Sequence, residues 1–176
     1  MEKKNLIVEP SKEARKEAMI QQAGELASYY KAIGFHCPEA TIRACADALG
    51  ITLSEDIKRC ASGFMGGGGG CGERCGVLEA GCMLVSLIYG RVTPVSAMWA
   101  NNSLIRRLHA RFHEEMKCLN CRDIQELEIN AGHAPELPSF CEHTFVEGSR
   151  LIVRLILESD ELLASVTDEE KAEEPD

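Results

Sequence analysis

The sequence predicts an all-α fold, a bundle of about five helices with a polyglycine loop before a central buried helix. Apolar residues recur at helical spacing in several segments, and no segment alternates apolar and polar residues as a half-buried strand would. The chain has 176 residues, of which 45% are hydrophobic and 27% are charged, as is typical of one folded domain. We therefore expect a single helical domain over residues 1–158 and an acidic tail over residues 159–176.

The first part of the chain contains three predicted helices. Residues 11–33 show the helical period and stop at Gly34. A second helix opens at Cys37 and ends before Gly50. Because the proline that follows Cys37 is tolerated at the first helical position, we expect Cys37 to be the N-cap. Ser54 precedes acidic residues and predicts a short third helix that runs toward the glycines.

A run of consecutive glycines, Gly66–Gly70, interrupts the helical pattern and predicts a loop. Glycine loses the most backbone entropy on ordering, so no regular element is expected there. From Glu73 the helical spacing returns and continues to Gly90, which predicts the central buried helix. Thr93 precedes a proline and predicts the start of a long helix that extends to about Lys117.

The last third of the chain contains two more predicted helices. A short helix is expected from Cys121 to Leu127. A connection rich in glycine and proline follows over residues 132–138. Ser139 is then expected to cap the final helix, with Cys141 just after the cap.

The charge distribution excludes some classes of partner. The formal net charge is −9, and most of it comes from residues 158–176, where Lys171 is the only base. The rest of the chain is close to neutral and offers no positive field for a phosphate backbone, so no nucleic-acid partner is expected. The longest apolar stretch, residues 82–89, is far too short to span a bilayer, so no membrane insertion is expected.

Nine cysteines are the most informative feature of the sequence. The first residues lack the apolar run of a secretory signal, so we expect a cytoplasmic protein. In a reducing compartment these thiols do not form a disulfide framework, and an odd number could not all pair within one chain. Metal ligation, redox chemistry or packing must therefore explain them.

Several of these cysteines lie at predicted helix starts, namely Cys37, Cys71, Cys75, Cys121 and Cys141. A helix start presents unpaired N–H groups and a partial positive charge, which favour the thiolate and lower the thiol pKa. Helix starts that meet at one point could hold an iron–sulfur cluster, whose usual ligands are thiolates. Backbone of the glycine loop could approach the cluster sulfides, because no Cβ stands in the way.

Other interpretations of the cysteines stay open. Buried cysteine often acts as a small apolar residue, and we expect packing roles for Cys45, Cys60 and Cys82. Cys118 and Cys121 form a CxxC pair, but it lacks the βαβ surroundings of a thioredoxin-like site and the histidine of a haem attachment site.

The remaining motifs favour ordinary structural roles. The glycine loop matches GxGxxG, yet no strand precedes it, so nucleotide binding is not expected. His109 and His113 lie one helical turn apart but lack the glutamate of HExxH, which favours a solvated or interfacial pair. His36 and His143 neighbour cysteines and could donate to a cluster or replace a thiolate, but a position on a helix shoulder is the simpler interpretation.

In this order along the chain, these segments resemble the C_GCAxxG_C_C family of redox-active proteins, over roughly residues 34–158. The resemblance is carried by Cys37, the glycine loop, Cys121 and Cys141, and by a central motif that reads Cys75-Gly76-Val77-Leu78-Glu79-Ala80-Gly81. The family motif is commonly written with alanine at the position of Val77 and glycine at that of Ala80, so close packing there is expected to differ slightly. Split-Soret cytochrome c is more distantly similar, but this chain lacks its haem attachment motif.

The resemblance implies redox activity, with an iron–sulfur cluster as the cofactor and electron transfer or redox sensing with a redox partner protein as the role. The expected ligands are Cys37, Cys75, Cys121 and Cys141, with Cys71 as the first substitute, and Gly68, Gly69, Gly70 and Gly76 are the expected backbone contacts. Four thiolates leave no obvious open iron for substrate chemistry. A second copy could cover a shallow cluster, so a homodimer is compatible with this role.

Two alternatives predict different chemistry. The first is metal-free thiol–disulfide or peroxide chemistry through Cys71 and Cys75 or through Cys118 and Cys121. The second is a zinc-stabilised helical interaction module that uses thiolates with or without His143.

Overall fold

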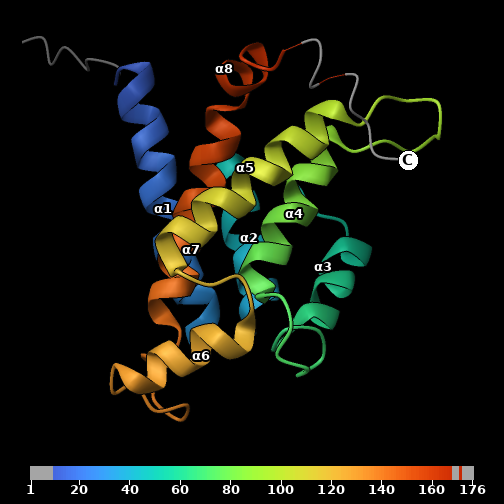
Figure 1. Cartoon of the computed structure of the whole chain (residues 1–176). Helices are drawn as coiled ribbons and strands as arrows, with labels where there is room; N and C mark the ends of the chain where they lie inside the picture. Colours follow the sequence, from blue (N-terminus) through green and yellow to red (C-terminus); the bar gives the residue numbers. More distant parts are fainter. Residues whose placement is uncertain (1–9, 168–170, 172–176) are drawn as a thin grey trace, which may run out of the picture.

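The computed structural model describes residues 10–167 and residue 171, and the regular secondary structure in them is helical (Figure 1). The elements are α1 (Lys12–Ala32), α2 (Cys37–Leu49), α3 (Glu55–Ala61), the 3-10 helix η1 (Ser62–Phe64), α4 (Gly76–Tyr89), α5 (Trp99–Met116), α6 (Cys121–Asn130), α7 (Glu142–Leu157) and α8 (Ser159–Ala164). The described ranges contain no strand, only one isolated bridge. The predicted all-α class is confirmed: α1 to α7 fall on the predicted helical segments, and α8 lies where the acidic tail was expected.

Three predicted helix ends follow ordinary capping chemistry. The Ser11 side chain accepts a hydrogen bond from the N–H of Ala14 (3.1 Å) at the start of α1. At the start of α3, Ser54 accepts from the N–H of Ile57 (3.3 Å). Gly50 ends α2 in the left-handed conformation (φ 69°), where a side chain would be strained. The sequence signals for these ends were therefore sufficient.

The helix α4 is the central helix, as predicted, and packs against α2, α5 and α7 (Figure 1). Val77 and Leu84 on α4 are fully buried. A Cβ atom at Gly81 would lie 2.8 Å from both Leu108 Cδ2 and Ile152 Cγ1. Glycine at this position therefore lets α5 and α7 approach the backbone of α4 closely.

Two helix starts near the cysteines differ from prediction. His36, not Cys37, is the N-cap of α2, and Cys37 is the first helical residue. The N–H of His36 donates a hydrogen bond to Glu39 Oε2 (3.2 Å), which completes a capping box. The helix α4 begins at Gly76 and not near Glu73, because the residues just before Gly76 pair with a distant extended segment.

The start of α5 is also later than predicted. Thr93 does not cap it, and the helix begins at Trp99. The Arg91 guanidinium donates to the carbonyl groups of Pro94 (3.1 Å) and Ser96 (3.2 Å). These bonds stabilise a turn in place of the first helical turn that the proline suggested.

The acidic C-terminal segment begins with the helix α8, which packs against α5 and α7. Ser159 at its start is buried, and Glu158 beside it bonds Arg111 of α5 (2.8 Å). Residues 168–170 and 172–176 of the predicted acidic tail lie outside the described residues.

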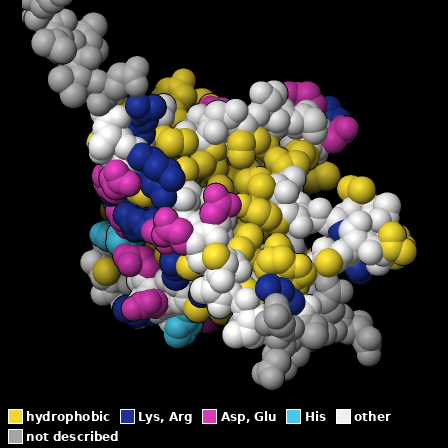
Figure 2. Space-filling view, turned by 90° about the horizontal axis from the view of Figure 1, so that it is seen from above, with side chains coloured by type: hydrophobic (Ala, Val, Ile, Leu, Met, Phe, Trp, Pro, Cys, Tyr) yellow, Lys and Arg dark blue, Asp and Glu magenta, His cyan; other side chains and the backbone are white. Residues whose placement is uncertain are grey.

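Apolar side chains gather on the face seen in Figure 2, at the end of the bundle where α8 and the connection from α4 to α5 lie in Figure 1. Exposed members on α4 and this connection are Leu87, Ile88, Val92 and Val95. The helix α6 lies at the opposite end (Figure 1). Of the described helices, none combines the length and the apolar character that a membrane span requires.

Candidate functional site

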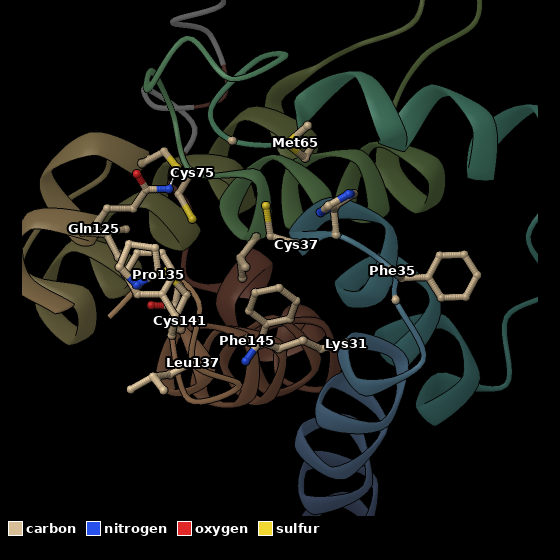
Figure 3. A pocket seen from close by; sticks show the side chains of 18 residues that line it. Lys31, Phe35, Cys37, Met65, Cys75, Gln125, Pro135, Leu137, Cys141 and Phe145 are labelled. Atoms are coloured by element: carbon tan, nitrogen blue, oxygen red, sulfur yellow. Dashed lines mark hydrogen bonds between the residues drawn. The ribbon is translucent and has the colours of Figure 1, made fainter. Parts of the chain in front are cut away.

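Four cysteines from four helix starts line one pocket of about 350 Å³. Cys37 is the first residue of α2 and Cys121 the first of α6, whereas Cys75 and Cys141 are the N-caps of α4 and α7. The apolar wall residues include Phe35, Met65, Ile124, Leu137, Phe140 and Phe145. Figure 3 shows Cys37, Cys75 and Cys141 around the same space, with the Phe35 ring turned away from it. The predicted convergence of helix starts is therefore present in the fold.

Backbone pairing places Cys75 beside Cys121, although the two are far apart in sequence. The N–H of Cys75 donates to the carbonyl of Leu119 (2.9 Å), and the N–H of Cys121 donates to the carbonyl of Glu73 (2.6 Å). This antiparallel contact includes the isolated bridge of the fold. It explains why α4 and α6 both begin at the pocket.

The polyglycine loop supports this pairing through its backbone conformation. Gly66–Gly70 and Gly72 all have positive φ values, a region that side chains rarely adopt. A Cβ atom at Gly67 would lie 2.5 Å from Glu73 N and 2.8 Å from Cys121 Cβ. The loop therefore wraps tightly around the segment that carries Cys75, and glycine is required there by conformation and close approach.

The loop glycines that were expected to contact a cofactor lie elsewhere. Gly66 lines the pocket, but Gly68, Gly69 and Gly70 are exposed and do not line it. A Cβ atom on any of these three would meet nothing within 4 Å. Their positive φ values explain the glycines without a ligand. The expectation for these three residues is corrected on this point.

Gly76, the fourth glycine of the prediction, packs closely against the Cys37 side chain. A Cβ atom at Gly76 would lie 2.7 Å from Cys37 Sγ and 2.9 Å from the carbonyl oxygen of Phe64. The first turn of α4 can therefore approach the Cys37 sulfur only because residue 76 has no side chain.

Cys141 occupies a strained position that a neighbouring carboxylate stabilises. Its φ of 56° is in the left-handed region, and it replaces the predicted Ser139 as the N-cap of α7. The N–H of Cys141 donates to Glu128 Oε2 (3.2 Å), and His133 Nδ1 lies 2.6 Å from the same oxygen. Glu128 on α6 thus joins the start of α7 to the connection between the two helices.

Two further polar side chains lie at the pocket. Gln125 Nε2 donates a hydrogen bond to Cys121 Sγ (3.4 Å). Lys31 Nζ bonds Glu142 Oε2 (2.6 Å) and lies 5.4 Å from the centre of the Phe145 ring. Gln125 lies on the Cys75 side of the pocket and Lys31 on the Phe145 side (Figure 3). The wall therefore combines one donor to sulfur with one cation.

Burial governs the protonation of the pocket thiols. It raises the pKa of Cys37 to about 11 and that of Cys141 to about 12. It also raises the pKa values of Cys75 and Cys121. Repulsion from Cys37 and Cys121 adds to the raised pKa of both Cys75 and Cys141, as expected for thiols that share one pocket.

The expectation that helix starts lower these pKa values is wrong for the pocket cysteines. The N–H of Gly66 does lower the pKa of Cys37, and the N–H of Val77 does lower that of Cys75. Both contributions are smaller than the loss of solvation on burial. Without a bound cation, the four thiols are therefore protonated at neutral pH.

The other cysteines lie apart from this pocket. Cys71, the expected substitute ligand, is exposed in the loop and does not share a helix with Cys75. Cys118 is only partly exposed. Burial is the main cause that raises its pKa, and the Asp123 and Glu126 carboxylates raise the pKa further. Cys121, by contrast, faces the pocket, so the two sulfurs of the CxxC pair have different surroundings.

The three cysteines for which a packing role was expected differ in their burial. Cys45 is fully buried in the core, and Cys82 is partly buried. Cys60 is exposed on α3, so a packing role is wrong for it.

The histidines lie at different places relative to the pocket. His36 lines the pocket as the N-cap of α2. His143 Nε2 lies 3.6 Å from Glu115 Oε1 on the surface. His109 contacts Arg74 and bonds the carbonyl of Ile105 through Nδ1 (2.8 Å). In the described part of the chain, no group of three or more His, Cys, Asp or Glu side chains is already arranged to hold a metal ion.

Sequence reasoning missed three residues of the site, Gln125, Glu128 and Gly66. Gln125 and Glu128 follow Cys121 by four and seven positions, the spacing of one helix face, and that signal was present. Nothing in the sequence distinguishes Gly66 from the glycines after it. Its contact with the pocket depends on the winding of the loop.

The comparisons with known proteins identify a family for this chain. A family model described as "Putative redox-active protein (C_GCAxxG_C_C)" matches residues 35–155. A curated protein of Archaeoglobus fulgidus, itself described as uncharacterized, is 42% identical over 52 residues, which cover 30% of this chain and 34% of that relative. The match thus spans about a third of the relative's length. No solved structure matches the chain. Because the family model covers the segments that carry all four pocket cysteines, the chain belongs to the C_GCAxxG_C_C family of redox-active proteins.

Proposed function

We propose that the four pocket cysteines hold an iron–sulfur cluster and that the protein transfers or senses electrons. The observation that carries this proposal is that Cys37, Cys75, Cys121 and Cys141 line the same pocket. Four thiolates are the usual protein ligands of such a cluster. When bound, the cluster would take up and release an electron at a potential set by its surroundings.

The chemistry of the pocket fits such a group. Its walls are largely apolar, which limits access of water to a bound cofactor. The N–H of Gly66 is directed toward Cys37, and Gln125 donates to Cys121. Hydrogen bonds of this kind stabilise negative charge on sulfur. Ligation by a cation also favours deprotonation of thiols whose pKa values burial has raised.

The family description favours a cluster over a single zinc ion. The matching family model describes redox-active proteins, and zinc has no redox chemistry, whereas an iron–sulfur cluster takes up and releases electrons.

Burial argues against three of the four thiols invoked for metal-free disulfide chemistry, the exception being Cys71, which is exposed. The attacking species in thiol–disulfide exchange is the thiolate. Burial raises the pKa values of Cys75, Cys118 and Cys121, so thiolate is scarce near neutral pH. We therefore place electron transfer ahead of this alternative. The redox partner protein, the cytoplasmic location and the homodimer stay predictions.

Metal analysis of the anaerobically purified full chain tests the proposal. The wild type should contain iron and acid-labile sulfide, absorb in the visible range and change its spectrum on reduction by dithionite. Serine in place of Cys37, Cys75, Cys121 or Cys141 should lower the iron and sulfide content in each case. Cys60→Ser is the matched control, because Cys60 is exposed on α3 and does not line the pocket.

The possible results separate the candidates. Stoichiometric zinc in the wild type would favour the interaction module. A protein that binds neither iron nor zinc, even after anaerobic incubation with iron and sulfide, would exclude both metal-based functions. Cys71→Ser provides a further control, and a loss of iron in this variant would restore Cys71 as a ligand despite its exposed position.

A further inference from the structure

We infer that Gln125 is a positioning residue that raises the reduction potential of the pocket's redox centre by donating a hydrogen bond to the sulfur of Cys121. This inference rests on the proposed function and extends it. In this inference Gln125, a neutral side chain that is not a ligand, controls how readily the centre accepts an electron.

The geometry of α6 makes this hydrogen bond a local property of one helix. Gln125 Nε2 lies 3.4 Å from Cys121 Sγ, and the two residues are four positions apart. Side chains with this spacing lie one above the other on the same helix face. Both residues line the pocket, and Ile124 between them is buried and anchors α6 to the core.

No other side chain of the described residues donates a hydrogen bond to a sulfur of the four pocket cysteines, so the contact is specific. Cys37 and Cys75 have backbone N–H groups nearby, which substitution cannot remove. For Cys121 the donor is a side chain, and Gln125 is only partly buried. The structure therefore offers one position at which hydrogen bonding to the centre can be altered without a change of ligand.

The effect on potential follows from charge. Reduction adds one electron to the cluster and its thiolates, and no bond forms or breaks. The added negative charge spreads onto the ligand sulfurs, and a donor N–H stabilises the reduced form more than the oxidised form. Removal of the donor should therefore make reduction less favourable. A carboxylate at the same position should do so more strongly, because it adds a negative charge near the pocket.

The test compares three anaerobically loaded proteins with the wild type. Gln125→Leu keeps a similar volume but removes the donor, and Gln125→Glu keeps the shape but replaces the donor with a carboxylate. Gln21→Leu is the matched control, because Gln21 on α1 is exposed and bonds Glu17 (2.7 Å). Midpoint potentials are measured by dithionite titration, followed by visible absorbance and electron paramagnetic resonance, and iron and sulfide are assayed for each variant.

We expect the midpoint potential to fall in the order wild type, Gln125→Leu, Gln125→Glu, with Gln21→Leu equal to the wild type. Iron and sulfide content should be unchanged in Gln125→Leu, and the iron–cysteine stretching bands in its resonance Raman spectrum should shift. Either signature alone distinguishes a hydrogen bond to sulfur from a purely structural role. If Gln125→Leu fails to fold, Gln125→Met, which also removes the donor without adding a charge, supplies the same comparison.

Two negative results have different meanings. A wild type that contains iron and sulfide, together with a Gln125→Leu potential equal to that of Gln21→Leu, would overturn the inference and leave the proposed function intact. A wild type without iron and sulfide would overturn the proposed function itself, and the inference with it.

Discussion

Cys45 on α2 isolates the effect of burial on a thiol in this fold. It is fully buried, lies outside the cysteine pocket and donates to the carbonyl of Ser149 (3.6 Å). Burial raises its pKa from the ordinary value of 9.0 to about 12. The hydrogen bond to Ser149 lowers the pKa but is the smaller contribution. No charged group contributes to the pKa of Cys45. Its raised pKa therefore shows the effect of desolvation, which also acts on the pocket cysteines.

This raised pKa predicts a loss of stability in alkaline solution. Between the unfolded pKa near 9 and the folded pKa near 12, the unfolded chain has lost the proton that the folded chain keeps. Stability from Cys45 is therefore complete below pH 9 and falls as the pH rises. At about pH 10.5 it should be lower by about 1–2 kcal/mol, since one pKa unit corresponds to about 1.4 kcal/mol.

The measurement is urea unfolding of the wild type and Cys45→Ala at about pH 7.5 and about pH 10.5. The wild type should be the more stable protein at the lower pH, because alanine leaves a small cavity. Its advantage should shrink or reverse at the higher pH. Other titrating groups are common to both proteins and cancel. An advantage of equal size at both pH values would show that Cys45 does not ionise with a raised pKa.

Gly76 gives the second prediction at the scale of single residues. Gly76→Ala would place Cβ 2.7 Å from Cys37 Sγ and 2.9 Å from the Phe64 carbonyl, so either the sulfur or the backbone must move. We expect a loss of about 1–3 kcal/mol in the free energy of unfolding, as for an overpacked core. We also expect reduced iron content after anaerobic loading, because Cys37 is displaced.

Gly63→Ala is the matched control for this substitution. Gly63 is exposed, and a Cβ atom there would meet nothing within 4 Å. This variant should be as stable as the wild type or slightly more so, and it should load normally. Equal stability and equal iron content in Gly76→Ala would show that α4 does not approach Cys37 closely.

At the scale of elements, α6 connects two of the pocket cysteines. It begins at Cys121, and Glu128 near its other end accepts from the N–H of Cys141 (3.2 Å) at the start of α7. The Glu128 side chain is only 12% exposed and also bonds His133 (2.6 Å). A partly buried carboxylate with two partners should contribute more to stability than a surface ion pair.

Glu128→Ala should therefore loosen the connection between α6 and α7. Loss of both hydrogen bonds should lower the free energy of unfolding by about 1–3 kcal/mol, measured by urea unfolding. Limited proteolysis should cut residues 131–141 faster than in the wild type. Glu126→Ala is the control, because Glu126 is exposed on the same helix. Identical cleavage rates in the two variants would mean that Glu128 does not fix the start of α7.

Comparison of individual elements shows which features could be predicted from sequence. The start of α3 was predictable because Ser54 forms its cap with a residue three positions away. The start of α4 was not, because residues just before it pair with the segment around Leu119, and no local pattern encodes such a distant contact. The helix start predicted at Thr93 is absent because hydrogen bonds from Arg91 stabilise a turn there.

At the scale of the whole molecule, the convergence of the cysteines could be predicted only as a hypothesis. The positions of cysteines at helix starts indicated which thiols could share a site, and the resemblance to a family narrowed this set to four expected ligands. The protonation of these thiols could not be predicted, because burial depends on the packing of α2, α4, α6 and α7 around the pocket. The same is true of Gly68, Gly69 and Gly70, whose distance from the pocket follows from the winding of the loop.

Loading of the pocket should stabilise one end of the molecule more than the other. The four cysteines belong to four different helix starts, so a bound cluster would cross-link elements that are far apart in sequence. Binding to the folded state alone raises the free energy of unfolding, by about 3 kcal/mol when the ligand is at one hundred times its dissociation constant. The gain should be concentrated in the segments next to the ligands.

Hydrogen exchange of the anaerobic protein, with and without iron and sulfide, measures this distribution. Loading should slow exchange most next to the pocket, in residues 65–66, 75–77, 121–125 and 135–141, and least in α8 at the opposite end of the bundle (Figure 1). Cys60→Ser should repeat this pattern, because its thiol is exposed and does not line the pocket, whereas Cys75→Ser should lose it along with the iron. Slower exchange in α8 alone, or equal slowing along the whole chain, would place the bound metal outside the four-cysteine pocket. Protection confined to the pocket segments would instead show that the thiols of α2, α4, α6 and α7 act together as one centre.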